Sequence, residues 1–220
     1  MKIHIFYRHF DISGTDGRRR PQWFDFEKCF KNLLNTIEGT QVNLNVIFDG
    51  HVEKNWIDKY KDKFTTHEIK AGGDQSSFFQ TWEIVKNSNI EDNDLIYFLE
   101  NDYLHLEGWV DKVVELFEKY DLLHYISTYD HNDKYFANYD DLVSKIFITD
   151  THHWRTTPST CGSFIINRKL FDLDYDIHNK FIDLYNNRQR MVITPIPGLS
   201  THCVDRLLSP TIDWEKINKK

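Results

Sequence analysis

The most constraining feature of the sequence is an unbroken run of five apolar residues, Leu95–Leu99, which leads directly into the acidic motif Glu100-Asn101-Asp102. A continuous apolar run, unlike an alternating one, is typical of a central strand that is buried on both faces of an α/β sheet. Ligands of such sheets bind in the crevice beyond the carboxyl ends of the strands. Glu100 and Asp102 are two residues apart and would project to the same side there. The run therefore predicts an α/β fold with a functional site at the end of this strand.

The two carboxylates of this motif are suited to a divalent metal ion. Mg²⁺ and Mn²⁺ are often held by only one or two protein carboxylates, while substrate phosphates and waters complete the coordination shell. We therefore expect Mn²⁺ or Mg²⁺ as a cofactor, with Glu100 and Asp102 as ligands. A purely structural interpretation stays open, because loops that follow strands are solvated and Asp favours turns.

Strands and helices alternate regularly in the first half of the chain. Strands are expected at residues 3–10, 42–48, 65–69 and 94–102, and helices at 24–37, 52–60, 76–86 and 108–120. This alternation implies a largely parallel sheet with helices on both faces. The second half is less regular, with strands expected near 124–128, 145–149, 163–167 and 191–195 and a helix at about 177–187.

Charge and cysteine content exclude several classes of protein. The net charge of −7 over 220 residues argues against a general nucleic-acid binder. The apolar start at residues 3–7 is cut short by Arg8, and no stretch approaches the roughly 20 apolar residues of a membrane helix. Three widely spaced cysteines indicate neither a disulfide framework nor a zinc cluster. We expect a cytoplasmic protein without a transmembrane segment.

A regular βα half that ends in an acidic motif, followed by an irregular half, resembles the GT-A class of nucleotide-sugar glycosyltransferases. The signature of that class is Asp-x-Asp at the end of the fourth strand, and Glu100-Asn101-Asp102 looks like a Glu-x-Asp variant of it. The resemblance implies one GT-A-like domain over residues 1–220, with a mixed, mostly parallel sheet. Its two abutting Rossmann-like halves would be a nucleotide-binding half, about 1–103, and an acceptor-side half, about 104–220.

The same resemblance implies the activity and the donor-side residues. A metal-dependent enzyme of this class transfers a hexosyl or related group from a UDP- or GDP-sugar to a carbohydrate acceptor, as in polysaccharide biosynthesis. His202 would be a third metal ligand, although a turn histidine bonded to the backbone is an alternative. Asp49 would contact the base or ribose, and Arg8 the diphosphate. The other expected nucleotide contacts lie before the second regular helix and inside the acidic motif: Gly73, Gln75 and Asn101.

Acceptor-side and catalytic residues are less tightly specified by the sequence. No Glu-Asp base motif of the common inverting type is present, so the stereochemistry stays open. An inverting enzyme would need a carboxylate base. The arginine run at residues 18–20 follows the first strand on the expected ligand side, where a guanidinium could bind a diphosphate, although a solvated charge run is the default interpretation. The expected acceptor contacts are Trp154, Arg155, Cys161 and Gly162; the catalytic candidates are Asp102, as the essential metal carboxylate, and Asp130, Asp172, Asp174 and Asp176, as possible bases.

Three other functions remain open from the sequence. A sugar nucleotidyltransferase has a related fold, but it would carry a Gly-rich loop with Arg and Lys directly after the first strand, where residues 11–22 offer only Gly14 and Gly17 beside the arginine run. A metal-dependent hydrolase or nuclease would need more ligands around one ion. A catalytically silent carbohydrate-binding domain of the same fold is the third alternative.

Overall fold

The computed structural model describes residues 1–10, 19–50, 56–120, 124–136, 139, 141–159, 162–178 and 190–219. Its strands are β1 (Ile3–His9), β2 (Val42–Asp49), β3 (Thr65–Ile69), β4 (Leu95–Glu100), β5 (Tyr103–His105), β6 (Tyr125–Ile126), β7 (Ile146–Ile148), β8 (His153–Thr157), β9 (Phe164–Asn167), β10 (Val192–Ile196) and β11 (Ser200–His202). The α-helices are α1 (Phe26–Ile37), α2 (Asp74–Lys86), α3 (Trp109–Lys119), α4 (Arg168–His178) and α5 (Trp214–Asn218), and the 3₁₀ helices are η1 (Ile57–Lys63) and η2 (Asn132–Tyr135).

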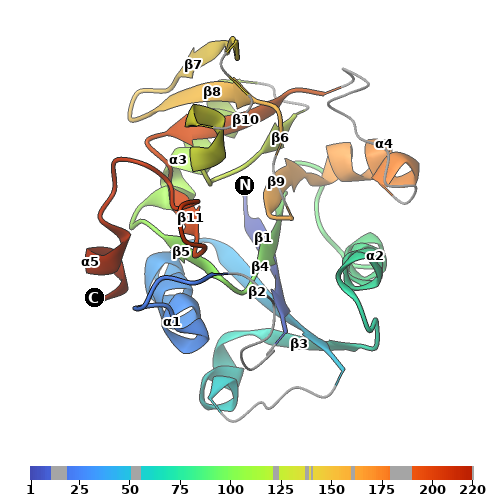
Figure 1. Cartoon of the computed structure of the whole chain (residues 1–220). Helices are drawn as coiled ribbons and strands as arrows, with labels where there is room; N and C mark the ends of the chain where they lie inside the picture. The colour runs from blue at the N-terminus through green and yellow to red at the C-terminus, as the bar shows by residue number, and fades with distance from the viewer. Residues whose placement is uncertain are drawn as a thin grey trace.

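Nine strands form one sheet in the order β3-β2-β1-β4-β9-β6-β10-β8-β7, and β5 pairs with β11 in a separate two-stranded sheet (Figure 1). The strands β3, β2, β1 and β4 are all parallel, as the alternating first half predicts. From β4 onward the sheet is mixed, because β9 runs antiparallel to both β4 and β6. The predicted α/β class with a large mixed sheet is confirmed.

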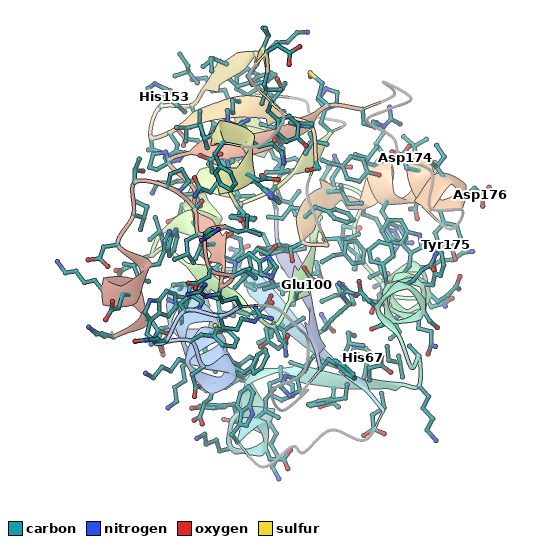
Figure 2. All side chains as sticks on the ribbon, in the orientation of Figure 1. His67, Glu100, His153, Asp174, Tyr175 and Asp176 are labelled. Carbon is teal, nitrogen blue, oxygen red and sulfur yellow. The ribbon has the colours of Figure 1, made fainter. Side chains whose placement is uncertain are left out.

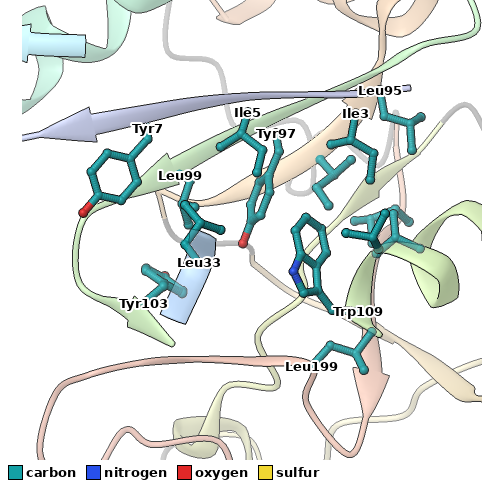
Figure 3. Packing of buried hydrophobic residues seen from close by; sticks show 14 of the residues in the cluster. Ile3, Ile5, Tyr7, Leu33, Leu95, Tyr97, Leu99, Tyr103, Trp109 and Leu199 are labelled. Atoms are coloured by element: carbon teal, nitrogen blue, oxygen red, sulfur yellow. The ribbon is translucent and has the colours of Figure 1, made fainter. Parts of the chain in front are cut away.

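The apolar run of β4 is buried on both sides, as its continuous pattern predicts. Leu95, Tyr97 and Leu99 pack on one face with α1 and α3, and Figure 3 shows them beside Trp109. The alternate residues of the strand, Ile96 and Phe98, pack on the other face with α2 and α4. Because successive side chains of a strand point to opposite faces, a strand covered by helices on both sides needs apolar residues at every position.

The structure corrects several element boundaries. The predicted helix at 52–60 is the 3₁₀ helix η1 in its described part, and residues 51–55 lie outside the described residues. The helix predicted at 177–187 lies, beyond His178, outside the described residues; the helix before that gap, α4, was not predicted and begins at Arg168, directly after β9. Its start is capped by Asn167, whose Oδ1 accepts the Leu170 backbone N–H at 2.7 Å. The sequence analysis missed this cap, and it missed β5, β8 and β11.

Two features near the carboxyl ends of the strands prepare the site. The helix α2 begins at Asp74 behind a Gly72-Gly73 turn, in which Gly72 has a positive φ of +69° that suits glycine. The antiparallel pairing of β11 with β5 places His202 opposite Tyr103. Among the described residues, no helix combines the length and apolar character that crossing a bilayer requires.

Candidate functional site

A cleft of about 350 Å³ lies beyond the carboxyl ends of β1, β2 and β4. This is the position predicted from the apolar run and the acidic motif. Most of its lining residues have polar side chains, including two arginines and five acidic or amide residues. The lining residues are Arg8, Phe10, Arg20, Phe26, Asp49, Gly73, Asp74, Ser77, Glu100, Asn101 and Asp102.

Asp102 is the most heavily contacted carboxylate in the cleft. Its Oδ2 accepts hydrogen bonds from Arg20 Nη1 at 2.7 Å and from His202 Nε2 at 2.8 Å. Burial alone would raise the pKa of Asp102, but the hydrogen bond and charge of His202, together with the charge of Arg20, lower it to about 2. Asp102 is therefore a carboxylate that stays ionised inside the protein.

His202 reaches Asp102 from a hundred residues further along the chain. The β11–β5 register brings it beside Tyr103, whose ring stacks on the imidazole at a centroid distance of 5.0 Å. The next residue, Cys203, donates its backbone N–H to the Asp102 carbonyl at 2.9 Å. The sequence prediction that His202 and Asp102 meet is matched by this geometry.

Glu100 occupies a different electrostatic environment two residues earlier. Its Oε1 lies 3.4 Å from Arg8 Nη2, and Ser163 Oγ lies 3.5 Å from its Oε2. Burial and the negative charge of Asp102 raise the pKa of Glu100, and Arg8 opposes them only in part. A Cβ atom on Gly162 would lie 2.9 Å from the Glu100 carboxyl carbon, so the glycine leaves the space that this side chain fills.

Arg8 lines the cleft next to Glu100. Its Nη1 donates to Asp74 Oδ1 at 2.8 Å, and its guanidinium lies 5.9 Å from the centre of the Phe78 ring. Within the described part of the chain, the buried Nε of Arg8 has no hydrogen-bond partner. Because the Asp74 side chain is 81% exposed, a ligand in the cleft can compete with it for the guanidinium.

The other predicted nucleotide contacts divide into those inside and those outside the cleft. Asp49 lines it and accepts the Ala71 backbone N–H on Oδ1 at 2.7 Å, which ties β2 to the loop before α2. Asn101 lines it and donates to the Phe10 carbonyl at 2.8 Å. Gly73 also lines the cleft, whereas Gln75 is exposed on the first turn of α2 and does not.

The predicted acceptor residues are placed differently from what the sequence suggested. Trp154 is fully buried in the core, because β8 lies between β10 and β7, so its ring is not a platform for a sugar. Arg155 is also buried, and its Nη2 donates to Asp130 Oδ1 at 2.8 Å. Neither lines the cleft. Gly162 contacts Glu100 on the donor side, and Cys161 lies outside the described residues.

The candidate base residues of α4 are not brought to the cleft. Figure 2 shows Asp174 and Asp176 on α4, well apart from Glu100. Asp174 is buried in a two-point contact with Arg190, at 2.8 and 2.9 Å, and it accepts the Tyr125 hydroxyl. Asp176 is exposed, and Asp172 is exposed and pairs with Arg168. The geometry therefore gives these acids structural or surface positions.

Two contacts near Asp102 carry no signal in the sequence. Arg20, expected to be solvated, lines the cleft and bonds to Asp102. Cys29 and Cys203 lie 174 positions apart, yet their sulfur atoms are 3.9 Å from each other beside the cleft. The position of Cys203 depends on the pairing of β11 with β5, which are strands of only three residues each.

The donor atoms at the cleft fit a hard or borderline divalent cation. The imidazole of His202 bonds to Asp102, and the charges of Asp102 and His202 both act on the buried carboxylate of Glu100. Oxygen ligands with one imidazole suit Mn²⁺ or Mg²⁺. Among the described residues, no group of three or more such side chains is already arranged to hold a metal ion. Arg20 and His202 both bond to Oδ2 of Asp102.

No protein-family model and no curated protein sequence matches the chain. Among solved structures, the chain superposes on CMP:2-keto-3-deoxy-manno-octonic acid synthetase complexed with CTP with a TM-score of 0.53 and 10% identity, covering 100% of this chain and 98% of that one. It superposes on S. aureus TarS 1–349 with a TM-score of 0.50 and 11% identity, covering 81% of this chain and 49% of that one. The fold is GT-A-like. The chain spans about half of that TarS structure, and the similarity at this identity concerns the fold alone.

The galactosyltransferase LgtC, solved with donor and acceptor sugar analogues, gives a TM-score of 0.48 and 12% identity, over 87% of this chain and 72% of that one. The superpositions on TarS and on the synthetase confirm the predicted GT-A-like architecture.

Proposed function

We propose that this protein transfers a sugar from a nucleotide-diphosphate sugar to a hydroxyl group of a carbohydrate acceptor, with Mn²⁺ or Mg²⁺ held by Glu100, Asp102 and His202. One observation carries the proposal: a single cleft gathers the guanidinium groups of Arg8 and Arg20 and the ionised carboxylate of Asp102, to which the imidazole of His202 is hydrogen-bonded. A diphosphate needs cationic partners on several sides, and this cleft offers them at the end of the central strand.

The residues of the cleft would divide the work of holding the donor. Arg8 has a buried Nε and an exposed partner, so its guanidinium has donors to offer to phosphate oxygens. Asp49 uses Oδ1 on the Ala71 N–H, which leaves the other oxygen to accept a ribose hydroxyl or a base N–H. Asp102 stays ionised at any physiological pH because of its lowered pKa.

A divalent ion at Glu100, Asp102 and His202 would supply charge stabilisation for the departing nucleoside diphosphate. The chain's own contribution is to hold those three side chains in place before the donor arrives. Gly162 and Ser163 fix Glu100, and the ring of Tyr103 fixes the plane of His202. Such preorganisation costs no rearrangement at the moment of reaction.

A nucleotidyltransferase is the second candidate, because the superposition with CMP:2-keto-3-deoxy-manno-octonic acid synthetase covers almost the whole of both chains. In that case the cleft would bind a nucleoside triphosphate, and the reaction would release pyrophosphate. The same Arg8 and Asp102 would contact the phosphates and the ion. The two candidates differ in product, so pyrophosphate release separates them.

Thermal unfolding with UDP, GDP or CTP, each with and without Mn²⁺, tests the proposal. A ligand that binds only the native state stabilises it by about 2.7 kcal/mol at a hundred times its Kd. We expect UDP or GDP to raise the melting temperature only with the metal, and Asp102→Asn to abolish that rise. Asp176→Asn, on the exposed surface of α4, is the matched control and should behave like the parent.

A panel of nucleotide sugars then tests for turnover by release of nucleoside diphosphate. Absence of any metal-dependent shift with UDP and GDP, together with parent-like behaviour of Asp102→Asn, would refute sugar transfer. Pyrophosphate release from CTP and a sugar acid would favour the nucleotidyltransferase instead.

A further inference from the structure

Arg20 is placed unlike its neighbour in the same arginine run. Its Nη1 donates to Asp102 Oδ2 at 2.7 Å and to the Cys203 carbonyl at 3.0 Å, and its guanidinium lies 4.7 Å from the centre of the Phe24 ring. The Arg20 side chain is only 16% exposed. Arg19, by contrast, is 81% exposed and pairs with Asp205 at 2.9 Å.

Arg20 holds a positive charge against the carboxylate that would bind the metal ion. Asp102 Oδ2 already accepts from Arg20 and from His202 Nε2. An ion held by Asp102 and His202 would share that carboxylate with Arg20 and would need the imidazole nitrogen that now bonds to Oδ2. A guanidinium does not lose its proton at accessible pH, so its charge either moves away or repels the incoming cation at close range.

We propose that Arg20 is a placeholder cation: it neutralises Asp102 while no divalent ion is bound, and it transfers to the diphosphate when the ion and the nucleotide bind together. This inference rests on the proposed function and concerns how the two ligands of that site depend on each other. The anchors of Arg20 support the transfer, because the Cys203 carbonyl and the Phe24 ring hold the guanidinium at the cleft when the Asp102 contact is released.

The placeholder role has a thermodynamic consequence that a purely structural role lacks. The ion alone brings positive charge next to Arg20 and supplies no anion to offset it, so it binds weakly. A diphosphate brings the negative charge that receives Arg20, so it strengthens binding of the ion. Because linkage is reciprocal, the ion strengthens binding of the diphosphate by the same factor. Arg20 thus makes the site respond to the metal–nucleotide complex rather than to either part.

Calorimetric titration with Mn²⁺, alone and with saturating UDP, tests this inference on the intact chain. Arg20→Met removes the charge but keeps an apolar side chain against Phe24. We expect this variant to bind Mn²⁺ alone about tenfold more tightly than the parent, within the usual range of coupling between ligands. The factor by which UDP tightens Mn²⁺ binding should fall to the same extent. Arg19→Met is the matched control, and both of its values should equal those of the parent.

Arg20→Gln provides a second neutral variant that keeps a donor for the Cys203 carbonyl, and the same two changes are expected of it if Arg20→Met does not fold. Arg20→Lys retains the charge and should keep the weak binding of Mn²⁺ alone. If the parent binds Mn²⁺ with UDP and the neutral variants match it in both titrations, the placeholder role is overturned while the proposed function stands. The titrations use GDP in place of UDP if only GDP stabilises the parent, and if the parent binds no Mn²⁺ with either nucleotide at saturation, both are overturned.

Discussion

Two buried aspartates, Asp102 and Asp130, each contact an arginine, but their surroundings differ. At Asp130 each oxygen has its own donor: Oδ1 accepts from Arg155 at 2.8 Å and Oδ2 from the Tyr135 hydroxyl at 2.7 Å. This group lines no part of the cleft. It is a closed pair in which one donor serves each acceptor, which is how a structural ion pair is satisfied.

At Asp102 two side chains, Arg20 and His202, both donate to one oxygen at the edge of the cleft. The pKa values respond in opposite directions: burial raises the pKa of Asp130, whereas His202 and Arg20 overcome burial and lower that of Asp102. An arginine beside a buried carboxylate therefore does not by itself mark a functional site. Donors that crowd one oxygen where a ligand has access are the more informative sign.

The largest expected effects are a loss of stability on changing Asp130 and a loss of binding on changing Asp102. Asp130→Ala leaves Arg155 buried without its counterion, and breaking a buried pair in this way typically costs about 3–5 kcal/mol in the free energy of unfolding. Asp102→Ala should be milder in stability, since Arg20 borders the cleft, but it should lose the metal-dependent binding of UDP. Urea unfolding and calorimetry measure the two quantities. Equal stability losses in both variants would break the comparison.

The pH dependence of stability should have opposite signs for the two aspartates. Asp102 has a folded pKa of about 2 against an ordinary 3.8, so its ionised form contributes about 2 kcal/mol that is present above pH ~4 and lost as the pH falls toward ~2. Asp130 has a raised pKa, so its ionisation lowers stability as the pH rises through its ordinary value toward its folded one.

Urea unfolding over the acidic range, on the parent and on Asp102→Asn and Asp130→Asn, measures this difference. The stability lost in Asp102→Asn should grow as the pH rises, and that lost in Asp130→Asn should shrink. The same slope in both variants would contradict the assigned environments.

The smallest expected effect concerns the space that Glu100 occupies. Gly162→Ala would place a Cβ atom 2.9 Å from the Glu100 carboxyl carbon, and a displacement of this kind should weaken metal-dependent UDP binding about tenfold, or roughly 1.4 kcal/mol. Adding Glu100→Asp withdraws the carboxylate by one methylene and should restore part of the loss. A double variant no better than the sum of its parts would show that the two residues act independently.

Local patterns predicted the first half of the fold well. The run Leu95–Leu99 identified the central strand, because burial on both faces leaves no polar position. The alternation of strands and helices up to α3 predicted that the strands of this half run parallel. The carboxylates of Glu100 and Asp102 were placed correctly because the end of a buried strand is a defined location. His202 was predicted on resemblance, and the structure brings it to Asp102.

Long-range pairing accounts for most of what the sequence did not predict. Trp154 lies in the core because β8 is an interior strand of the sheet. That position depends on its pairing with β10, which comes later in the chain. Asp174 forms an ion pair with Arg190. The local sequence pattern did not predict that these two side chains meet. Arg20 could not be distinguished from Arg19 by composition or spacing, since only the position of Asp102 separates a cleft residue from a solvated one.

The pairing of β11 with β5 has a consequence for the order in which the site is assembled during synthesis. The strands β1 to β4 and the Asp102 carboxylate leave the ribosome early, but their imidazole partner lies at position 202, and the strand beside β4, β9, begins only at Phe164. A nascent chain therefore lacks the histidine partner of Asp102 until residue 202 has been translated.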